Sequence, residues 1–284
     1  MKKSIIFCLC IAVVALFSAC KDPEGMYNPS KKIQKIFYVN DEGVNELTEV
    51  WNWDGKLLTS IDNVDGSDTY KTVFTYDSKN RLATMDAEDG HGEFVYNGKY
   101  LEKIVLTSEG VSYAMEIKHE KGKISEITMD NFMELLDWKT MKMVNPLRFM
   151  IPEAFPAVEK AMKKCPADAK GEQIVVKLIW KGDNVSSLVM DVPVYGMMFT
   201  ETIDFTFDNY NNPMYGSFAS MVSDAGTFTF LNKNNPLTMK TSYLGQVLDS
   251  SEFTYEYEGK YPIKVTSKSV EEDEVYTETY VYEY

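Results

Sequence analysis

The side chains in this sequence that could carry chemistry are few. The chain has two histidines, His91 and His119. Neither stands at metal-ligand spacing from another histidine or a cysteine, so the sequence predicts no zinc site and no histidine-based triad. Cys165 follows two lysines, as an activated thiol could, but it falls on an apolar stripe of helical spacing, which favours burial over nucleophilic attack. There is also no Gly-x-Ser-x-Gly elbow, phosphate loop or dinucleotide fingerprint.

Carboxylates are abundant, with 43 Asp and Glu residues. Glycoside hydrolysis uses a pair of carboxylates, but the sequence singles out no pair among so many. Residues 62–68 and 86–90 each contain the Asp-Gly pair of a calcium loop. That alignment puts Ile61 at position one of the first loop and Ala87 at position three of the second, where an oxygen ligand is needed. We therefore interpret both as turns and assign no catalytic, cofactor-binding or metal-binding residue.

The N-terminus has the pattern of an export signal. A short basic start precedes an apolar run, residues 5–17, which is too short to span a bilayer as a mature helix. The run ends in Ser18-Ala19-Cys20, which resembles a bacterial lipobox, although Phe17 departs from the aliphatic residue usual there. We predict a lipoprotein signal peptide over residues 1–19 and lipidation of Cys20. The alternative is an ordinary secretory signal that carries a cysteine.

A flexible tether is predicted over residues 20–32. Its first part, Lys21-Asp22-Pro23-Glu24-Gly25, is polar and rich in structure breakers. The same stretch resembles the acidic export tags of surface lipoproteins in Bacteroidetes. Once the leader is removed and Cys20 is acylated, Cys165 is the one remaining thiol, so no internal disulfide is expected.

Composition indicates a folded, acidic β protein. The chain is 44% hydrophobic and 13% aromatic, which is enough apolar surface to offset the entropy of ordering, and aromatic residues favour strands. The formal net charge of -14 repels phosphate backbones, so we expect no nucleic-acid partner. The same charge repels anionic bilayers. Membrane attachment is therefore expected through the lipid on Cys20.

One pattern recurs along the chain: aromatic, any residue, aromatic, a polar residue, Gly or Asn, then a short apolar run. The copies begin at Trp51, Phe74, Phe94, Ile117, Leu178, Phe205, Phe228 and Tyr255. Residues at i and i+2 of a strand share a face, and Gly or Asn tolerates the positive φ of a tight turn. Each copy therefore predicts a hairpin with one apolar face, and neighbouring hairpins must bury that face together. We predict one all-β domain, residues 33–284, forming an antiparallel meander that curls into a strongly curved sheet or a barrel.

Residues 131–172 interrupt this rhythm. Apolar residues there fall at helical spacing, and prolines separate or end the segments. The sequence predicts a small two-helix insertion between hairpins. We expect the helices to plug the concave side of the sheet, and the alternative is a lid over a pocket.

Phe74-Thr75-Tyr76-Asp77-Ser78-Lys79-Asn80-Arg81-Leu82 resembles the YD repeat of Rhs-type proteins, with Asn80 in place of the glycine. The other copies keep the spacing but not the arginine. With its lipobox, the mature chain also resembles a group of Bacteroidetes lipoproteins of unknown function that have a porin-like fold. That resemblance implies a large curved or barrel-like sheet and supplies no catalytic residue.

The end of the chain leaves one alternative open. Tyr276, Tyr280, Tyr282 and Tyr284 alternate as in the last strand of an outer-membrane barrel. The opposite face of that strand carries threonine and glutamate, which suits water or a polar lumen equally well. Insertion of the barrel itself into a membrane is therefore kept as an alternative to the lipid anchor.

The functional prediction is a non-catalytic binding or interaction protein, held by lipid on the outer membrane and displayed on the cell surface or toward the periplasm. Its ligand would be a glycan or a protein, because exposed aromatic side chains stack on sugars and peptides. Two alternatives remain: a carboxylate-dependent hydrolase acting on glycans, and a structural or lipid-carrier protein of the envelope. No cofactor is expected.

Overall fold

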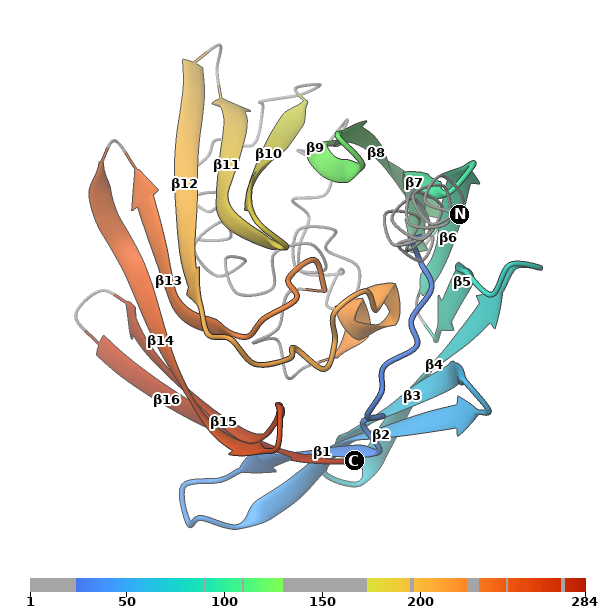
Figure 1. Ribbon diagram of the computed structural model, residues 1–284, viewed down its shortest axis with the longest axis vertical. Coiled ribbons are helices and arrows are strands. Elements are labelled where there is room, and N and C mark those ends of the chain that lie inside the picture. The colour runs from blue at the N-terminus through green and yellow to red at the C-terminus, as the bar shows by residue number, and fades with distance from the viewer. Residues whose placement is uncertain are drawn as a thin grey trace, which may run out of the picture.

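The computed structural model describes residues 24–88, 90–108, 110–129, 173–194, 197–223, 230–243, 245–271 and 274–284. Within these residues sixteen strands form a closed antiparallel barrel (Figure 1). The strands are β1 (Lys35–Val39), β2 (Asn45–Asp54), β3 (Leu57–Asp65), β4 (Asp68–Tyr76), β5 (Leu82–Ala87), β6 (Gly90–Asn97), β7 (Tyr100–Ser108), β8 (Val111–Glu120), β9 (Lys123–Met129), β10 (Ile174–Lys181), β11 (Asn184–Val194), β12 (Met197–Phe207), β13 (Pro236–Tyr243), β14 (Gln246–Glu258), β15 (Tyr261–Glu271) and β16 (Glu274–Glu283). This confirms the predicted all-β meander and decides in favour of a barrel over an open curved sheet.

The two helices predicted at 131–172, together with Cys165, lie outside the described residues. The helical element that the structure describes is η2 (Phe218–Val222), a 3-10 helix of 5 residues. Among the described residues, no helix has the length and apolar character needed to cross a membrane.

The barrel closes between the first and last strands. Ile36 of β1 faces Glu49 of β2 on one side and Tyr282 of β16 on the other. Ile36 and Tyr282 are both buried, and the rings of Tyr38 and Tyr280 meet edge to face with centroids 5.7 Å apart. The tyrosine alternation at the end of the chain therefore serves to seal the ring.

The two ends of the barrel are unlike. Six tight turns lie at one end, named here the repeat end because the predicted repeats turn there; they join β2 to β3, β4 to β5, β6 to β7, β8 to β9, β10 to β11 and β14 to β15. The long connection from β12 to β13, residues 208–235, starts at the same end and carries η2 into the ring of strands (Figure 1). The other end, with the β1–β2 and β3–β4 turns, is named the distal end.

The apolar face of the repeats points inward. Trp51, Phe74 and Phe94 are buried, and the Phe94 ring lies 5.8 Å from that of Phe218 in η2. The inner wall and the 208–235 connection thus share one core, and burying this apolar surface is the main force that holds them together.

One predicted hairpin is not seen among the described residues. The sixth and seventh copies, which begin at Phe205 and Phe228, share the single connection between β12 and β13. Phe230 of the seventh copy is buried against Phe218, with ring centroids 5.0 Å apart. Asparagine side chains replace strand pairing here, since Asn212 Nδ2 donates to the carbonyl of Asn232 at 2.7 Å. These side-chain hydrogen bonds satisfy backbone groups that a strand would otherwise pair.

The outward face of the barrel is polar. Cross-strand ion pairs lie on it: Lys71–Asp62, Lys103–Glu116, Lys118–Glu126, Lys177–Asp191 and Lys264–Glu256. Threonine hydroxyls also pair across strands, as between Thr75 and Thr84 at 2.7 Å. A membrane-spanning barrel needs a continuous apolar band on this face, whereas here exposed apolar side chains such as Val95 and Ile179 are scattered. The wall suits water, which argues against the alternative of membrane insertion.

The second aromatic of a repeat joins it to the preceding hairpin. The Tyr96 hydroxyl donates to the carbonyl of Leu82 at 2.8 Å, and the Arg81 guanidinium lies 4.0 Å from the centre of the Tyr96 ring. Arg81 Nη1 also donates to the carbonyl of Gly98 at 2.8 Å, in the turn that follows Tyr96. We call this arrangement of cation, ring and two carbonyls the clasp.

Two tryptophans repeat the clasp. Trp180 Nε1 donates to the carbonyl of Ile124 at 2.6 Å, with Lys123 4.7 Å from its ring centre. Trp53 Nε1 donates to the carbonyl of Ile33 at 2.8 Å, with Lys32 5.0 Å from its ring. In each case the cation also donates to the carbonyl of the glycine in the next turn. Tyr and Trp carry an O–H or N–H at the tip of the ring. One such side chain can therefore bury apolar surface and also donate a hydrogen bond to the backbone of a neighbouring segment.

The N-terminal segment from residue 24 packs on the repeat end. Tyr27 is buried, and its hydroxyl donates to the carbonyl of Pro213 at 2.6 Å. Ile33 is also fully buried. Any free tether must therefore end before Glu24, earlier than the predicted boundary at residue 32.

Candidate binding cleft

A partly open cleft of about 480 Å³ lies at the repeat end. It is formed by residues 24–30, the β6–β7 and β8–β9 turns, the end of β10 and the 208–235 connection. The side chains that give it chemical character are Glu24, Tyr100, Lys123, Trp180, Lys233 and Tyr261. Its size lies within the range typical of small-molecule sites.

One wall depends on a departure from the repeat. His119 occupies the position where the other copies have Tyr, Trp or Phe, and its Nε2 lies 2.9 Å from a carboxylate oxygen of Glu24. The same carboxylate accepts a hydrogen bond from the backbone N–H of Leu101 at 2.8 Å, and the Tyr100 ring lies 4.8 Å from the imidazole. In this copy the side chain therefore binds the N-terminal segment rather than the preceding hairpin.

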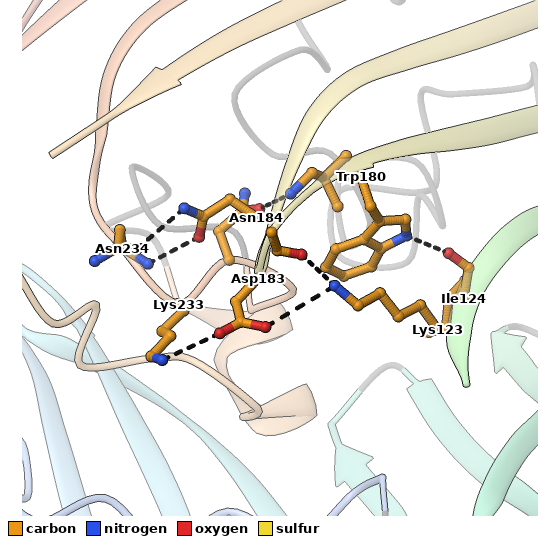
Figure 2. Close-up of polar contacts among 10 residues, drawn as sticks. Lys123, Ile124, Trp180, Asp183, Asn184, Lys233 and Asn234 are labelled. Carbon is orange, nitrogen blue, oxygen red and sulfur yellow. Dashed lines mark hydrogen bonds and ion pairs between the residues drawn. The ribbon is translucent and has the colours of Figure 1, made fainter. Parts of the chain in front are cut away.

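The facing wall is built around Trp180 (Figure 2). Lys123 lies over the indole ring and 3.9 Å from Asp183, while Lys233 of the 208–235 connection approaches the other oxygen of Asp183 at 3.1 Å. Asn184 and Asn234 bond each other twice, side chain to side chain at 3.0 Å and backbone N–H to side chain at 3.1 Å. These contacts fix the 208–235 connection against the β10–β11 turn.

The composition of the cleft suits a polar ligand with apolar faces. Aromatic rings provide stacking surfaces, and Lys99, Lys123 and Lys233 provide N–H donors. Glu24 is the carboxylate among the described lining residues, and it is already bonded to His119. The described lining therefore lacks the pair of acids that the hydrolase alternative requires.

A buried acid pair does occur elsewhere, inside the barrel. Glu201 of β12 and Asp249 of β14 are both buried, and on β13, which lies between these strands, Glu201 pairs with Tyr243 and Asp249 with Thr241. Burial, and then the negative charge of Asp249, raise the pKa of Glu201 to about 7. Neither acid lines the cleft. Ionising one desolvated carboxyl next to another is unfavourable. The folded state is therefore destabilised when both acids of the pair are charged.

The two histidines lie at opposite ends. His91 stands on the outer wall near the distal end, with Nδ1 2.6 Å from Asp86 and Nε2 3.4 Å from Glu93. The hydrogen bond to Asp86 is the main cause that raises the pKa of His91. The acidic stretches 62–68 and 86–90 form hairpin ends at the distal end, and the described residues hold no group of three metal-ligating side chains. Cys20 lies outside the described residues, so its lipidation stays a prediction.

Sequence reasoning missed the cleft itself. Its walls come from segments that are far apart in the chain, and the Glu24–His119 contact spans 95 residues. The one available signal was that a histidine replaces an aromatic in the fourth copy of the repeat, which begins at Ile117. The structure shows that this position has a different bonding partner.

Comparison with solved structures finds proteins of similar structure. A porin-like protein from Bacteroides uniformis has a TM-score of 0.48 and 11% sequence identity, over 90% of this chain and 99% of that one. No protein-family model and no curated protein matches the sequence. The assignment of the fold as a closed barrel therefore rests on the strand pairing observed in this structure.

Proposed function

We propose that the protein is a lipid-tethered, non-catalytic binding protein of the outer membrane and that its ligand is a glycan. The observation that carries the proposal is the cleft at the repeat end, where Tyr100 and Trp180 stand among lysine and amide groups. Sugars present apolar C–H faces that stack on aromatic rings, and their hydroxyls accept hydrogen bonds from lysine and asparagine.

The rest of the molecule is consistent with a scaffold for that site. The clasps join neighbouring hairpins near the cleft, and the 208–235 connection is held by asparagine bonds, so the walls are placed before a ligand arrives. A site that is already ordered loses less entropy when it binds. The polar outer wall keeps the barrel in water, so attachment to the membrane would come from the lipid predicted on Cys20.

Binding can be tested with the full chain. Screening purified protein against envelope and medium glycans by calorimetry should find a ligand, and Trp180→Phe should weaken it about tenfold, since stacking area is lost. Trp53→Phe is the matched control: Trp53 makes the same kind of carbonyl bond beneath a lysine but does not line the cleft. Affinity should be unchanged in this control.

Three outcomes would count against the proposal. If no glycan binds while a protein partner does, the ligand class is wrong. If the two tryptophan variants weaken binding equally, the cleft is not the site. Mass spectrometry of the mature chain tests the anchor separately, because an unmodified Cys20 would remove the lipid tether.

A further inference from the structure

The tight turns at the repeat end are rich in lysine, although the chain as a whole is acidic. Each of the six turns carries one exposed lysine, and together we call them the lysine ring: Lys56, Lys79, Lys99, Lys121, Lys181 and Lys260. Among the described residues, none of the six forms an ion pair, although most wall lysines do. The ring is therefore a set of cations without ion-pair partners around one rim of the barrel, although Lys99 lies 5.1 Å from the centre of the Tyr100 ring and acids such as Asp54 and Glu120 lie beside the lysines.

The distal end has the opposite character. Its described turns and strand ends carry Asp41, Glu42, Asp65, Asp68 and Glu88, and no lysine or arginine lies in a described turn there. The two ends therefore differ in charge: the described distal turns carry acids and no lysine or arginine, whereas each repeat-end turn carries a lysine beside an acid or an amide. Such a separation orients a protein near any charged surface.

The chain also enters the fold at the repeat end. The backbone N–H of Glu24 donates to the carbonyl of Lys99, a member of the ring, at 3.2 Å. Cys20 precedes Glu24 by four residues, a stretch that reaches about 14 Å at most when fully extended. A lipid on Cys20 would hold the lysine ring within a Debye length or so of the bilayer surface.

We propose that the repeat end faces the membrane that carries the lipid, and that the lysine ring contacts the phosphate groups of its headgroups. This inference rests on the proposed lipid anchor, and it turns the cleft, which lies at the same end and includes Lys99, toward the bilayer. A ring of sixteen strands has a diameter on the order of 25–30 Å, so no small anion could touch lysines on opposite sides. A flat array of phosphates can contact all of them together.

The test uses hydrogen exchange of the full mature chain bound to vesicles. Neutral phosphatidylcholine vesicles are compared with vesicles that contain about one third phosphatidylglycerol, a composition with a negative surface potential. On the anionic vesicles, amides of the six repeat-end turns should exchange about tenfold more slowly than on the neutral ones. Amides of the distal turns should not change.

Two charge variants separate the ring from net charge. Changing the six ring lysines to Gln should abolish the slowing. The matched control changes six outer-wall lysines to Gln, with the same loss of charge, and should retain it; those residues are Lys71, Lys103, Lys118, Lys177, Lys240 and Lys268. Circular dichroism confirms folding of both, since exposed ion pairs contribute little to stability.

The outcomes distinguish the two proposals. If the protein does not float with neutral vesicles, the lipid anchor is absent. Comparing hydrogen exchange with and without anionic vesicles then still tests whether the lysine ring contacts anionic headgroups. Three results would contradict the proposal that the lysine ring contacts the headgroups. They are slower exchange at the distal turns, equal slowing on neutral and anionic vesicles, and equal loss of the slowing in the two charge variants. Equal slowing by a short DNA duplex would show a general polyanion surface and would overturn the membrane assignment.

Discussion

Arg81 and Tyr96 form a closed unit between two consecutive hairpins. The guanidinium lies 4.0 Å from the ring centre, and the Tyr96 hydroxyl donates to the carbonyl of the residue after Arg81 at 2.8 Å. Asp77 Oδ2 completes the unit by accepting from Arg81 Nε at 2.7 Å. The Tyr-Asp and Arg-Leu pairs of the YD-like copy therefore have a joint purpose: Asp77 shapes the turn and holds the arginine that the next tyrosine packs under.

Removing the Tyr96 hydroxyl tests the clasp. Tyr96→Phe leaves the carbonyl of Leu82 without this donor while keeping the ring, so the free energy of unfolding should fall by about 1 kcal/mol. Tyr38→Phe is a suitable control, because the Tyr38 hydroxyl has no hydrogen bond to another described residue. Urea denaturation followed by circular dichroism measures both. Equal stability of the two variants would mean that the clasp contributes nothing.

The His119–Glu24 contact should hold the N-terminal segment in place. His119→Phe keeps a ring at this position but removes the bond to the carboxylate, so residues 24–33 should exchange amide hydrogens faster and trypsin should cut sooner at Lys31. The cost to global stability should be about 1–2 kcal/mol, because one partner of the bond is charged. His91→Phe, on the outer wall, is the control and should leave that segment unchanged.

The buried Glu201 should make stability depend on pH. Its folded-state pKa, about 7, lies above its ordinary value of 4.5, so the native state binds this proton more tightly than the unfolded state does. Stability from this group is full below pH 4.5 and is lost as the pH rises through 7, by up to about 3 kcal/mol. Glu201→Gln removes the titration. The variant should match the wild type at pH 4 and exceed it at pH 8.

Thermal unfolding across that pH range gives the measurement, with Glu252→Gln as the control. Glu252 is exposed on the outer wall of the strand that carries Asp249. If the Glu201→Gln variant shows the same pH profile as the wild type, the carboxyl is not held as described.

Gly92 is closely packed on the inner wall. A Cβ at this position would lie 2.8 Å from both Cγ and Cε of Met85 and 3.2 Å from Cδ2 of Leu106. Gly92→Ala should therefore destabilise the barrel by about 1–3 kcal/mol through overpacking. In a Met85→Ala background the added methyl fills space instead, so the penalty should shrink or reverse. Additive effects in this double-mutant cycle would argue against the contact.

The hairpins could be predicted because their determinants are local. Aromatic residues two apart share a face of a strand, and a glycine such as Gly98, with φ of 63°, permits the turn that follows. Asn80, with φ of 59°, does the same in the YD-like copy, as its place in the pattern indicated. The return strand expected for the sixth copy does not form among the described residues, because a matching pattern does not provide a strand partner.

The candidate site could not be predicted, because it depends on which distant segments meet. Glu24 was assigned to a tether, yet the structure places it between the Leu101 backbone and the His119 ring. Glu201 and Asp249 looked like two acids among many, and only their inward direction on strands β12 and β14 makes them a pair. Neither the Glu24–His119 contact nor the Glu201–Asp249 pair can be recognised from the spacing of residues along the sequence.

The amino-acid sequence by itself determined the strands, their turns and the apolar side of each, since these depend on residues within a few positions of one another. The tertiary structure decided that the sheet closes, because closure requires Ile36 to meet Tyr282 across nearly the whole chain. Closure in turn placed the six lysine-bearing turns on one rim and buried Glu201 and Asp249. Which charges and rings face one another is a property of the closed ring, and no single hairpin contains it.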